Sequence, residues 1–439
     1  MPAPTFPALD QIRTLSTVDV LVAGGGSAGC VAAIAAARAG ARVLLVERHG
    51  TLGGIGTSVL DTFYGFYTPG PNLRVVGGIA QEVVDSLTAR DAAFIRPNTY
   101  GAGGGVTYSP EVLTMLWDEL VVGSGVDVLF HTTAIDTAVD PATGAVTDVL
   151  LATRNGLRRV SASTVVDTTG DADICAHAGA GFDSARPDAP VQALTTTFRV
   201  AGVDTERARS FPKEELFALM AKAARGGDYD LPRQEGSIHR TPVEGVSLAN
   251  MTRVEGVDPT DPQQLSRAEI AGRRQVGEYV RFLRDLVPGY EKATLVGLSA
   301  HIGVREARRI HGDYRLTADD VLGARRFPDA IAQCGAPIED HSGGTDTVWR
   351  YIPDDGTYDI PLRCLLPVGL RNVVVAGRCL SASHEAHASA RSIAQCMAMG
   401  QAAGTLAALS AAGGTAPREV DVAALQRHLR ADGALLSSG

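Results

Sequence analysis

The sequence lacks the cysteine patterns that indicate disulfide or metal-cluster chemistry. Its 439 residues include only six cysteines, which are scattered without a C-x-x-C or C-x4-C spacing. A disulfide framework is not expected in a chain of this length, and dithiol exchange or a cysteine-ligated iron–sulfur cluster requires paired cysteines. We therefore expect neither a redox-active disulfide nor a metal site.

The chain also lacks a surplus of positive charge and a long apolar run. Its formal net charge is −9, and its 45% hydrophobic and 20% charged residues are ordinary for a globular protein. An acidic chain has no global attraction for nucleic acid or anionic lipid. No run approaches the roughly 20 apolar residues that cross a bilayer, and residues 1–17 lack the pattern of a secretory signal. We expect no nucleic-acid partner, no membrane span and a cytoplasmic location.

Residues 18–48 instead contain a strong motif, read as strand, glycine turn, helix and strand. The turn satisfies G-x-G-x-x-G, and an acidic residue ends the second strand. In such a unit the glycines allow a tight turn, close approach of a diphosphate and helix packing, while the helix start holds the phosphates and the acid binds a ribose diol. A dinucleotide is expected to contact Gly24, Gly26, Ser27, Ala28, Gly29 and Glu47.

A second glycine cluster directly follows the acidic residue and comprises Arg48, Gly53, Gly54, Gly56 and Thr57. Here an acidic residue is followed by Arg, a short spacer and Gly-Gly. This pattern resembles the one found in the large flavoprotein superfamily of glutathione reductase and fumarate reductase. That resemblance implies FAD, because this long molecule runs past the second strand and needs bare backbone beside its phosphates and ribityl chain.

Two later segments resemble the places where this superfamily's chain returns to FAD. Residues 165–171 correspond to its A-T-G-D signature, with Thr168 in place of Ala, and residues 372–378 form a strand and turn before an alanine-rich helix at about 392–412. That helix is expected to direct its N-terminus at the flavin. By this resemblance further cofactor contacts come from Ala134, Gly170, Asp171, Gly377 and Arg378, although relatives usually carry an acidic residue at the last position.

Residues 301–320, 358–367 and 376–404 extend the resemblance to the FAD-dependent oxidoreductase family, near the fumarate reductase and succinate dehydrogenase flavoproteins. It implies an α/β fold: a Rossmann-like FAD-binding domain of the glutathione reductase type, with a parallel sheet plus a β-meander, interrupted by an α+β cap or substrate domain. The expected boundaries are 1–185 and 346–439 for the FAD-binding domain and 186–345 for the cap. Within the cap we expect a strand at 192–200, helices at 213–225 and 263–287, and flanking loops at 226–262 and 335–346.

Chemical candidates gather in residues 381–391, at a place where the resemblance puts the flavin ring. His384 falls at the offset of the substrate-binding histidine of fumarate reductases, but the arginine four residues beyond is here Ala388, and the nearest cation is Arg391. Either His384 or His387 could act as a base, with Glu385 orienting an imidazole or raising its pKa. The alternatives are a histidine that only hydrogen-bonds flavin or backbone, and a metal site that lacks a further spaced ligand.

A second candidate cluster begins at His301. On a helix, His301, Arg305 and Arg308 share one face by their spacing. Arginine forks hold carboxylates through paired hydrogen bonds, so an anionic substrate would suit this face. The alternative is an Arg/Glu network that ties the cap to the FAD-binding domain.

These observations together predict hydride transfer between a small organic substrate, for which a carboxylate is a fitting group, and flavin N5, most simply as a dehydrogenase or oxidase. A reductase of activated C=C bonds and a flavoprotein electron-transfer subunit are the alternatives, and hydroxylation is less favoured because no NAD(P)H-linked hydroxylase motif is present. No second G-x-G-x-x-G follows a strand, so a separate acceptor is needed: oxygen, a quinone or a carrier. A homo-oligomer is compatible with the sequence.

Overall fold

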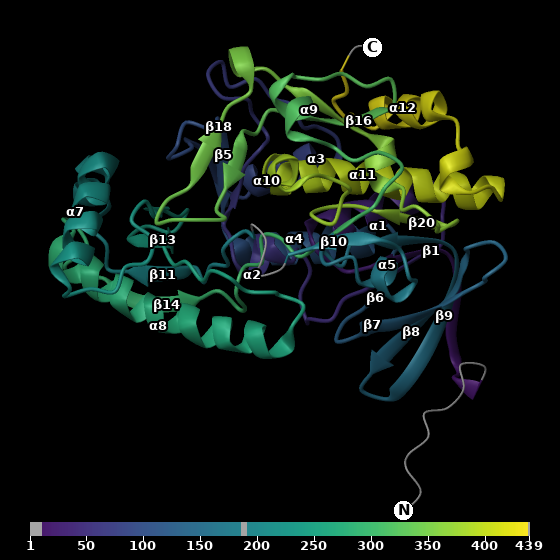
Figure 1. Ribbon diagram of the computed structural model, residues 1–439, viewed down its shortest axis with the longest axis horizontal. Helices are drawn as coiled ribbons and strands as arrows, with labels where there is room; N and C mark the ends of the chain where they lie inside the picture. Colours follow the sequence, from purple (N-terminus) through teal and green to yellow (C-terminus); the bar gives the residue numbers. More distant parts are fainter. Residues whose placement is uncertain (1–10, 186–190, 438–439) are drawn as a thin grey trace, which may run out of the picture.

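The computed structural model describes residues 11–185 and 191–437, and its largest element there is a seven-stranded sheet (Figure 1). Neighbouring strands in its parallel part follow the order β6-β2-β1-β9, with β20 also parallel to β9. β2, β20 and the C-terminal parts of β1 and β9 are apolar and buried on both faces, as expected when helices cover a parallel sheet. Their bounds are Thr14–Ala23 (β1), Val43–Val46 (β2), Asp127–Leu129 (β6), Gly156–Asp167 (β9) and Val373–Val375 (β20).

The predicted meander is confirmed at the other edge of this sheet. β7 (Thr133–Val139) and β8 (Val146–Thr153) pair antiparallel with each other, and β8 pairs antiparallel with the first half of β9. The second half of β9 runs parallel to β1 and β20 and ends at Asp167. The structure is therefore a mixed α/β fold whose parallel sheet resembles a Rossmann-type FAD-binding domain, with additional antiparallel sheets.

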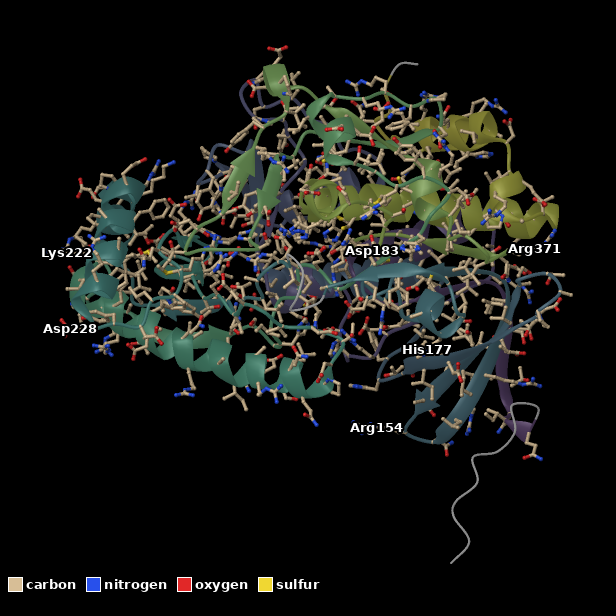
Figure 2. All side chains as sticks on the ribbon, in the orientation of Figure 1. Arg154, His177, Asp183, Lys222, Asp228 and Arg371 are labelled. Carbon is tan, nitrogen blue, oxygen red and sulfur yellow. The ribbon has the colours of Figure 1, made fainter. Side chains whose placement is uncertain are left out.

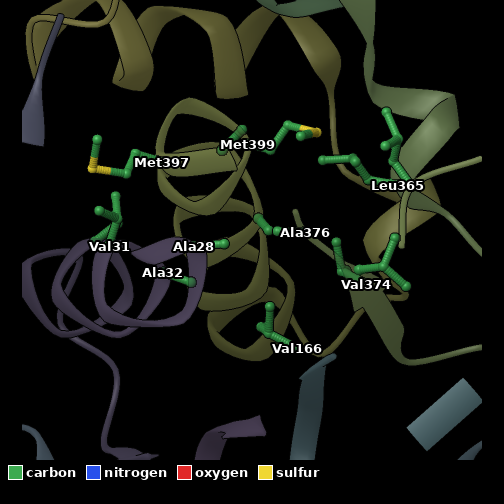
Figure 3. Close-up of a cluster of buried hydrophobic side chains, with 14 of the residues drawn as sticks. Ala28, Val31, Ala32, Val166, Leu365, Val374, Ala376, Met397 and Met399 are labelled. Carbon is green, nitrogen blue, oxygen red and sulfur yellow. The ribbon is translucent and has the colours of Figure 1, made fainter. Parts of the chain in front are cut away.

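Two alanine-rich helices, α1 (Ser27–Arg38) and α11 (Ile393–Gly413), pack side by side in the main core (Figure 3). A Cβ on Gly400 would lie 2.3 Å from the carbonyl oxygen of Ala28, and one on Gly404 would lie 2.1 Å from that of Ala32. The pairs advance by four residues on both helices, so the helices run in the same direction. The predicted helix at 392–412 is confirmed, and its glycines are required because the two backbones nearly touch.

Three helices and a small sheet lie between β2 and β6 in the chain, and two of these helices, α3 and α4, contact α1. They are α2 (Ile55–Ser58), α3 (Ile79–Thr88), α4 (Pro110–Gly123) and a three-stranded antiparallel sheet in the order β3-β5-β4, with bounds Thr62–Phe63, Gly104–Tyr108 and Ala93–Pro97. After β9 come α5 (Asp173–His177) and β10 (Phe182–Ser184), and β10 pairs with β15 (Arg308–Ile310).

The middle of the chain builds a four-stranded antiparallel sheet in the order β12-β13-β11-β14. Its strands are Ser237–Arg240, Val246–Asn250, Phe198–Ala201 and Thr294–Leu298, and its helices are α6 (Thr205–Ser210), α7 (Lys213–Gly226) and α8 (Pro262–Leu286). These elements, which we call the cap sheet and cap helices, enclose their own hydrophobic cluster. In Figure 2, Lys222 and Asp228 lie at the far end of this part, and Arg154 lies at the tip of the β8–β9 turn. The domain boundaries themselves stay a prediction.

The helices predicted at 213–225 and 263–287 are confirmed, but four other expectations for this part were wrong. The strand predicted at 192–200 begins only at Phe198, because residues 194 and 195 make isolated bridges to Val254 and Gly303 instead of a ladder. The loop predicted at 226–262 contains β12 and β13, and the loop at 335–346 contains β17 (Ile338–Asp340). The helix required by the spacing of His301 and Arg305 is absent: residues 299–307 are irregular and lead into β15.

The remaining elements return the chain to the main core. They comprise α9 (Ala318–Leu322), α10 (His384–Ala390), α12 (Val422–Ala431), and the strands β16 (Ala330–Cys334), β18 (Val348–Arg350) and β19 (Tyr358–Pro361). Short 3-10 turns within the described residues lie at Pro353–Asp355, Leu362–Leu365 and Pro417–Glu419. Ser383 caps α10 by accepting a hydrogen bond from the Ala386 N–H, and two residues separate the end of α10 from the start of α11.

Candidate functional site

Three glycines of the turn after β1 have different structural roles: one adopts a positive φ, one lets α1 pack closely, and one leaves space for a ligand. Gly24 has φ of +102°, and a Cβ there would lie 2.5 Å from the Thr168 carbonyl oxygen. A Cβ on Gly29 would lie 1.8 Å from the Gly24 carbonyl oxygen, so this position must stay bare for α1 to pack. A Cβ on Gly26, by contrast, meets nothing within 4 Å. Gly26 therefore borders open space, as the approach of a ligand requires.

The start of α1 has hydrogen-bond donors to offer. Its N-cap is Gly26, which provides no side-chain cap, so the first N–H groups keep their donors and the helix dipole favours an anion. The Ser27 hydroxyl donates to the Gly53 carbonyl at 3.0 Å. A diphosphate fits these bare N–H groups and the open space over Gly26.

The second glycine cluster lies directly against the first. The Gly53 N–H donates to the Gly25 carbonyl at 2.8 Å, and a Cβ on Gly54 would lie 2.9 Å from the Gly26 Cα. Gly54 then begins α2, which contains Gly56 and Thr57, and the Thr57 hydroxyl donates to the Leu52 carbonyl at 2.6 Å. The two clusters thus form one continuous stretch of bare backbone, which suits the length of FAD.

Glu47 is buried at the end of β2 and is held by backbone donors. Its carboxylate accepts from the N–H groups of Gly25 and His49, each at 2.7 Å. Neighbouring Arg48 is exposed and lies 3.2 Å from the His49 ring nitrogen, and His301 stacks on His49 at 5.3 Å. His301 therefore lies beside the Glu47 end of the motif rather than with the polar cluster around Arg391. The ribose contact of Glu47 stays a prediction.

Residues 165–171 and 372–378 both contact the glycine turn that follows β1 or the start of α1. The Thr168 hydroxyl lies within hydrogen-bond distance of the carbonyls of Ala23 (2.9 Å) and Gly24 (2.7 Å). Arg378 donates to the Asp171 carboxylate at 2.6 Å and lies beside Gly170. Gly377 lies next to Ala28, and Ala134 lies partly buried in β7. Arg378 is thus paired with Asp171 of the 165–171 segment, which explains how its positive charge is accommodated at this turn.

The start of α11 is a second helix N-terminus without a side-chain cap. Ser392, the N-cap of α11, makes no side-chain cap bond. Because Gly400 faces Ala28 and the helices are parallel, α11 extends about six residues, or roughly 9 Å, beyond the start of α1. The two helix dipoles therefore favour negative charge at two separated points, as a diphosphate and a reduced flavin ring would present.

His384 is held between two carboxylates that the sequence did not reveal. Its Nδ1 lies 2.9 Å from Glu306, and its Nε2 lies 3.2 Å from Asp340. Burial opposes protonation, but the hydrogen bonds to Asp340 and Glu306 outweigh it and raise the pKa of His384 to about 9. His384 is therefore an imidazolium at neutral pH and not a base. The predicted partner, Glu385, makes neither contact.

His387 is the opposite case, one turn further along α10. It is fully buried, and its Nε2 donates to the Arg378 carbonyl at 2.8 Å. Burial lowers the pKa of His387 to about 3, so the ring is neutral at physiological pH. It ties α10 to the turn that follows β20 and is a weak proton acceptor.

Three arginines gather beside the start of α11, and we call them the arginine cluster: Arg233, Arg305 and Arg391. In the part of the chain that the structure describes, their hydrogen bonds go to uncharged oxygens. Arg305 donates to the Ala193 carbonyl at 2.6 Å, and Arg391 donates to the Glu339 carbonyl at 3.3 Å. Arg233 donates to the Asn250 side chain at 3.3 Å. Burial, then repulsion by the other two arginines, lowers the pKa of Arg305 to about 9.

Glu339 and His341 of the β17 region complete the polar surroundings of this cluster. His341 lies 2.9 Å from the Glu339 carboxylate through Nε2. Burial raises the pKa of Glu339, but His341, Arg391 and Arg305 outweigh it and lower the pKa to about 2. Burial and Arg305 lower the pKa of His341. Glu339 therefore faces Arg305 and Arg391, and Arg391 also interacts electrostatically with the Glu306 and Asp340 carboxylates.

The structure thus divides the predicted second cluster. Arg305 joins Arg391, whereas His301 lies against His49, and Arg308 donates to Asp173 at 2.8 Å in a structural ion pair. Sequence reasoning missed Glu306, Asp340 and Glu339. The only available signal was the run Glu339–His341 directly after the apolar Ile338, a polar group at the end of a strand. Among the described residues no group of three or more His, Cys, Asp or Glu side chains could hold a metal ion.

Residues 19–429 match the family described as FAD dependent oxidoreductase, and the chain belongs to this family. The protein is an FAD-dependent oxidoreductase, and the bare glycine backbone and the two uncapped helix starts fit that cofactor.

Aklavinone 12-hydroxylase DnrF of Streptomyces peucetius is 40% identical over 98 residues, which are 22% of this chain. The chain spans about a fifth (19%) of the length of that curated relative. The solved structure of p-nitrophenol 4-monooxygenase PnpA from Pseudomonas putida DLL-E4 is similar, with a TM-score of 0.53, 13% identity and coverage of 94% of this chain and 84% of that chain. This likeness shows a shared fold.

A geranylgeranyl bacteriochlorophyll reductase-like protein from Thermoplasma acidophilum also matches, with a TM-score of 0.46, 14% identity and coverage of 95% of this chain and 83% of that chain. In the described part of the chain, no helix combines the length and apolarity needed to cross a membrane.

Proposed function

We propose that the protein oxidises a small organic anion, transferring a hydride from its C–OH, C–N or C–C group to the flavin. The arginine cluster carries this proposal. Arg391 directly precedes Ser392, the N-cap of α11, so this arginine lies at the helix start that suits a reduced flavin. FAD, when bound, supplies the hydride acceptor.

Each residue of the cluster has a distinct role in this proposal. The Nε atoms of Arg233 and Arg391 are buried without a hydrogen-bond partner, which leaves donors for a ligand. A carboxylate that bridges Arg305 and Arg391 would relieve their mutual repulsion and restore the pKa of Arg305. Glu339 stays ionised and spaces the arginines, and protonated His384 adds a further positive charge on the α10 side.

Hydroxylation is the second candidate, and the match to aklavinone 12-hydroxylase favours it. Its matched stretch is short, and the chain covers only 19% of that relative. The C=C reductase, the electron-transfer subunit and a place near the fumarate reductase branch remain as the alternatives that the sequence left open. The departure at Ala388 argues against simple fumarate chemistry, because the corresponding arginine is missing.

Anaerobic bleaching of the flavin tests the proposal. Purified holoprotein is mixed with a panel of small 2-hydroxy and 2-amino carboxylates, their methyl esters, and NADPH. We expect at least one carboxylate to bleach the 450 nm band, its ester to fail, and Arg391→Met to abolish the effect while the exposed control Arg154→Met retains it. Bleaching by NADPH alone, with ¹⁸O from O₂ appearing in a product, would establish hydroxylation instead.

A further inference from the structure

A buried histidine–aspartate pair connects the cap sheet to the three-stranded sheet. His239 lies in β12, and Asp61 directly precedes β3. The Nε2 of His239 lies 2.9 Å from Oδ1 of Asp61, and the two side chains are only 10% and 1% exposed. No spacing pattern joins the two residues, since they are separated by 178 positions and His239 falls in the segment predicted to be a loop.

Each member of this pair has one buried atom without a hydrogen-bond partner: Nδ1 of His239 and Oδ2 of Asp61. The carboxylate accepts a hydrogen bond, so Nε2 of a neutral His239 carries the proton and Nδ1 keeps a free lone pair. His384 differs, because both of its ring nitrogens contact carboxylates. His387 also has an unpartnered Nδ1, but its Nε2 donates to a backbone carbonyl and no acid orients it.

The groups that face the pair keep His239 neutral. Burial lowers its pKa, Asp61 raises it, and Arg96 lowers it. Arg96 donates to the Thr107 hydroxyl at 2.8 Å and to the Tyr64 hydroxyl at 2.8 Å. The Thr62 hydroxyl donates to Asp61 at 3.0 Å. His239 is therefore a neutral imidazole at physiological pH, with Nδ1 as its unprotonated nitrogen.

Neighbouring residues connect the pair both to the arginine cluster and to the start of α11. On the cap sheet, His239 pairs with Leu248 and Ser237 pairs with Asn250, so His239 and Asn250 share a face as diagonal neighbours, about 7–8 Å apart. Asn250 accepts a hydrogen bond from Arg233. On the other side, the Tyr64 carbonyl accepts from the Ala394 N–H in the first turn of α11 at 3.3 Å.

A small cavity adjoins the same place. Its volume is about 240 Å³, and its lining includes Leu60, which precedes Asp61, and Leu248, which lies opposite His239. The cavity borders residues next to the pair, but neither His239 nor Asp61 lines it.

We propose that His239, oriented by Asp61, is the base that takes the proton from the substrate during its oxidation. This inference rests on the proposed function and deepens it. For an alcohol, His239 would take the O–H proton at Nδ1 as the C=O bond forms, and FAD, when bound, would supply the acceptor for the C–H hydrogen and its electron pair. Asp61 is a positioning residue: it fixes the tautomer and stabilises the imidazolium that results.

The first test is single-turnover reduction of the flavin by the fastest carboxylate of the panel above. General-base catalysis typically contributes 10²–10⁴-fold, so His239→Gln should slow reduction at least about hundredfold and leave the Kd of the carboxylate within a few-fold. Asp61→Asn should slow it at least tenfold and shift the pH profile. The matched control is His311→Gln, because His311 and Asp183 form an exposed pair at 3.1 Å; it should react at the wild-type rate.

The second test needs no turnover. In holoprotein labelled with ¹⁵N-histidine, the signals absent from His239→Gln identify His239, and we expect an unprotonated Nδ1 and a protonated Nε2 at pH 7. In Asp61→Asn this tautomer preference should weaken. Retention of the 450 nm band and of the wild-type Tm shows which variants fold, with His239→Asn as a second choice.

The outcomes separate the two proposals. If the carboxylate bleaches wild type and His239→Gln equally fast, or if Nδ1 is protonated at pH 7, the assignment of His239 is wrong while the proposed oxidation stands. If no carboxylate bleaches wild type, or Arg391→Met bleaches normally, the proposed oxidation fails and the role of His239 in it fails with it.

Discussion

The dinucleotide turn and the arginine cluster differ in how the chain assembles them. The turn comes from one strand–helix–strand unit, and its chemistry belongs to backbone N–H groups at the start of α1. The cluster draws Arg233 from the cap, Arg305 from an irregular segment and Arg391 from the α10–α11 junction. In the first region, the glycines lie within one short motif, and contacts with Gly53 and Thr168 complete the geometry. In the second, side chains meet only because the tertiary fold brings distant segments together.

The largest effect is expected at the turn. Gly29→Ala would place its Cβ 1.8 Å from the Gly24 carbonyl oxygen, so the backbone itself must move. Such overpacking typically costs 1–3 kcal/mol and displaces the N–H groups that hold the cofactor. We expect the purified variant to carry less than about a tenth of the wild-type FAD, measured by the 450 to 280 nm absorbance ratio. Gly123→Ala is the control, because a Cβ there meets nothing within 4 Å; equal FAD loss in both would contradict the argument.

The arginine cluster should respond in the opposite way, losing function without losing stability. Arg305→Met removes a charge whose pKa is lowered to about 9 by burial and by neighbouring arginines. Loss of a charge-assisted bond costs about 1.5–3 kcal/mol, so the Kd of the carboxylate should rise roughly 10- to 150-fold, while the Tm stays equal or rises. Calorimetric titration and thermal unfolding measure the two effects.

Arg308→Met is the matched variant for this comparison. Arg308 pairs with Asp173 and lies apart from the cluster, so its loss should lower the Tm and leave carboxylate binding unchanged. A parallel loss of stability and binding in both variants would remove the distinction between a ligand site and a structural network.

This contrast also explains what the sequence predicted and what it could not. The positive φ of Gly24 and the close approach of Gly29 to the Gly24 carbonyl both arise within one short motif. The spacing of that motif therefore predicted the parallel strands and α1, while alternating strands and an alanine-rich run predicted the meander and α11. Arg305 required a helix that does not form, because residues 299–307 bond instead to separate segments such as Thr195 and Ser58. Asp61, Glu306 and His239 carry no spacing signal, since the partners of each lie on other elements and only the packed structure brings them together.

A smaller effect is expected from the charge on His384. Its pKa rises from the usual 6.5 to about 9, so the stabilisation is fully present below pH 6.5 and is lost as the pH rises through 9. After allowance for partial exposure we expect about 1–2 kcal/mol. The difference in unfolding free energy between wild type and His384→Gln should therefore shrink between pH 6 and pH 10 in urea titrations.

His387 provides the control on the same helix. Its pKa is lowered to about 3, so its protonation does not change between pH 6.5 and pH 10. His387→Asn should shift stability by a constant amount across that window. If the His384→Gln difference is equally flat, the imidazolium assignment is wrong and a proton-accepting role for His384 returns.

The smallest effect is expected at Thr168. Replacing this residue tests whether the glycine turn keeps its geometry without a hydrogen bond from a distant part of the chain. Thr168 stands where relatives carry Ala, and its hydroxyl reaches the carbonyls of Ala23 and Gly24 from β9, on the far side of the motif. Thr168→Ala should lose about 0.5–1.5 kcal/mol of stability, the net value of one hydrogen bond. Thr168→Ser keeps the hydroxyl and should lose less. Because Gly24 already fits against the Thr168 backbone, FAD content should stay near wild type in both variants. A large FAD loss in Thr168→Ala alone would mean that this chain holds its dinucleotide turn by a long-range bond, and the contrast with the arginine cluster would narrow.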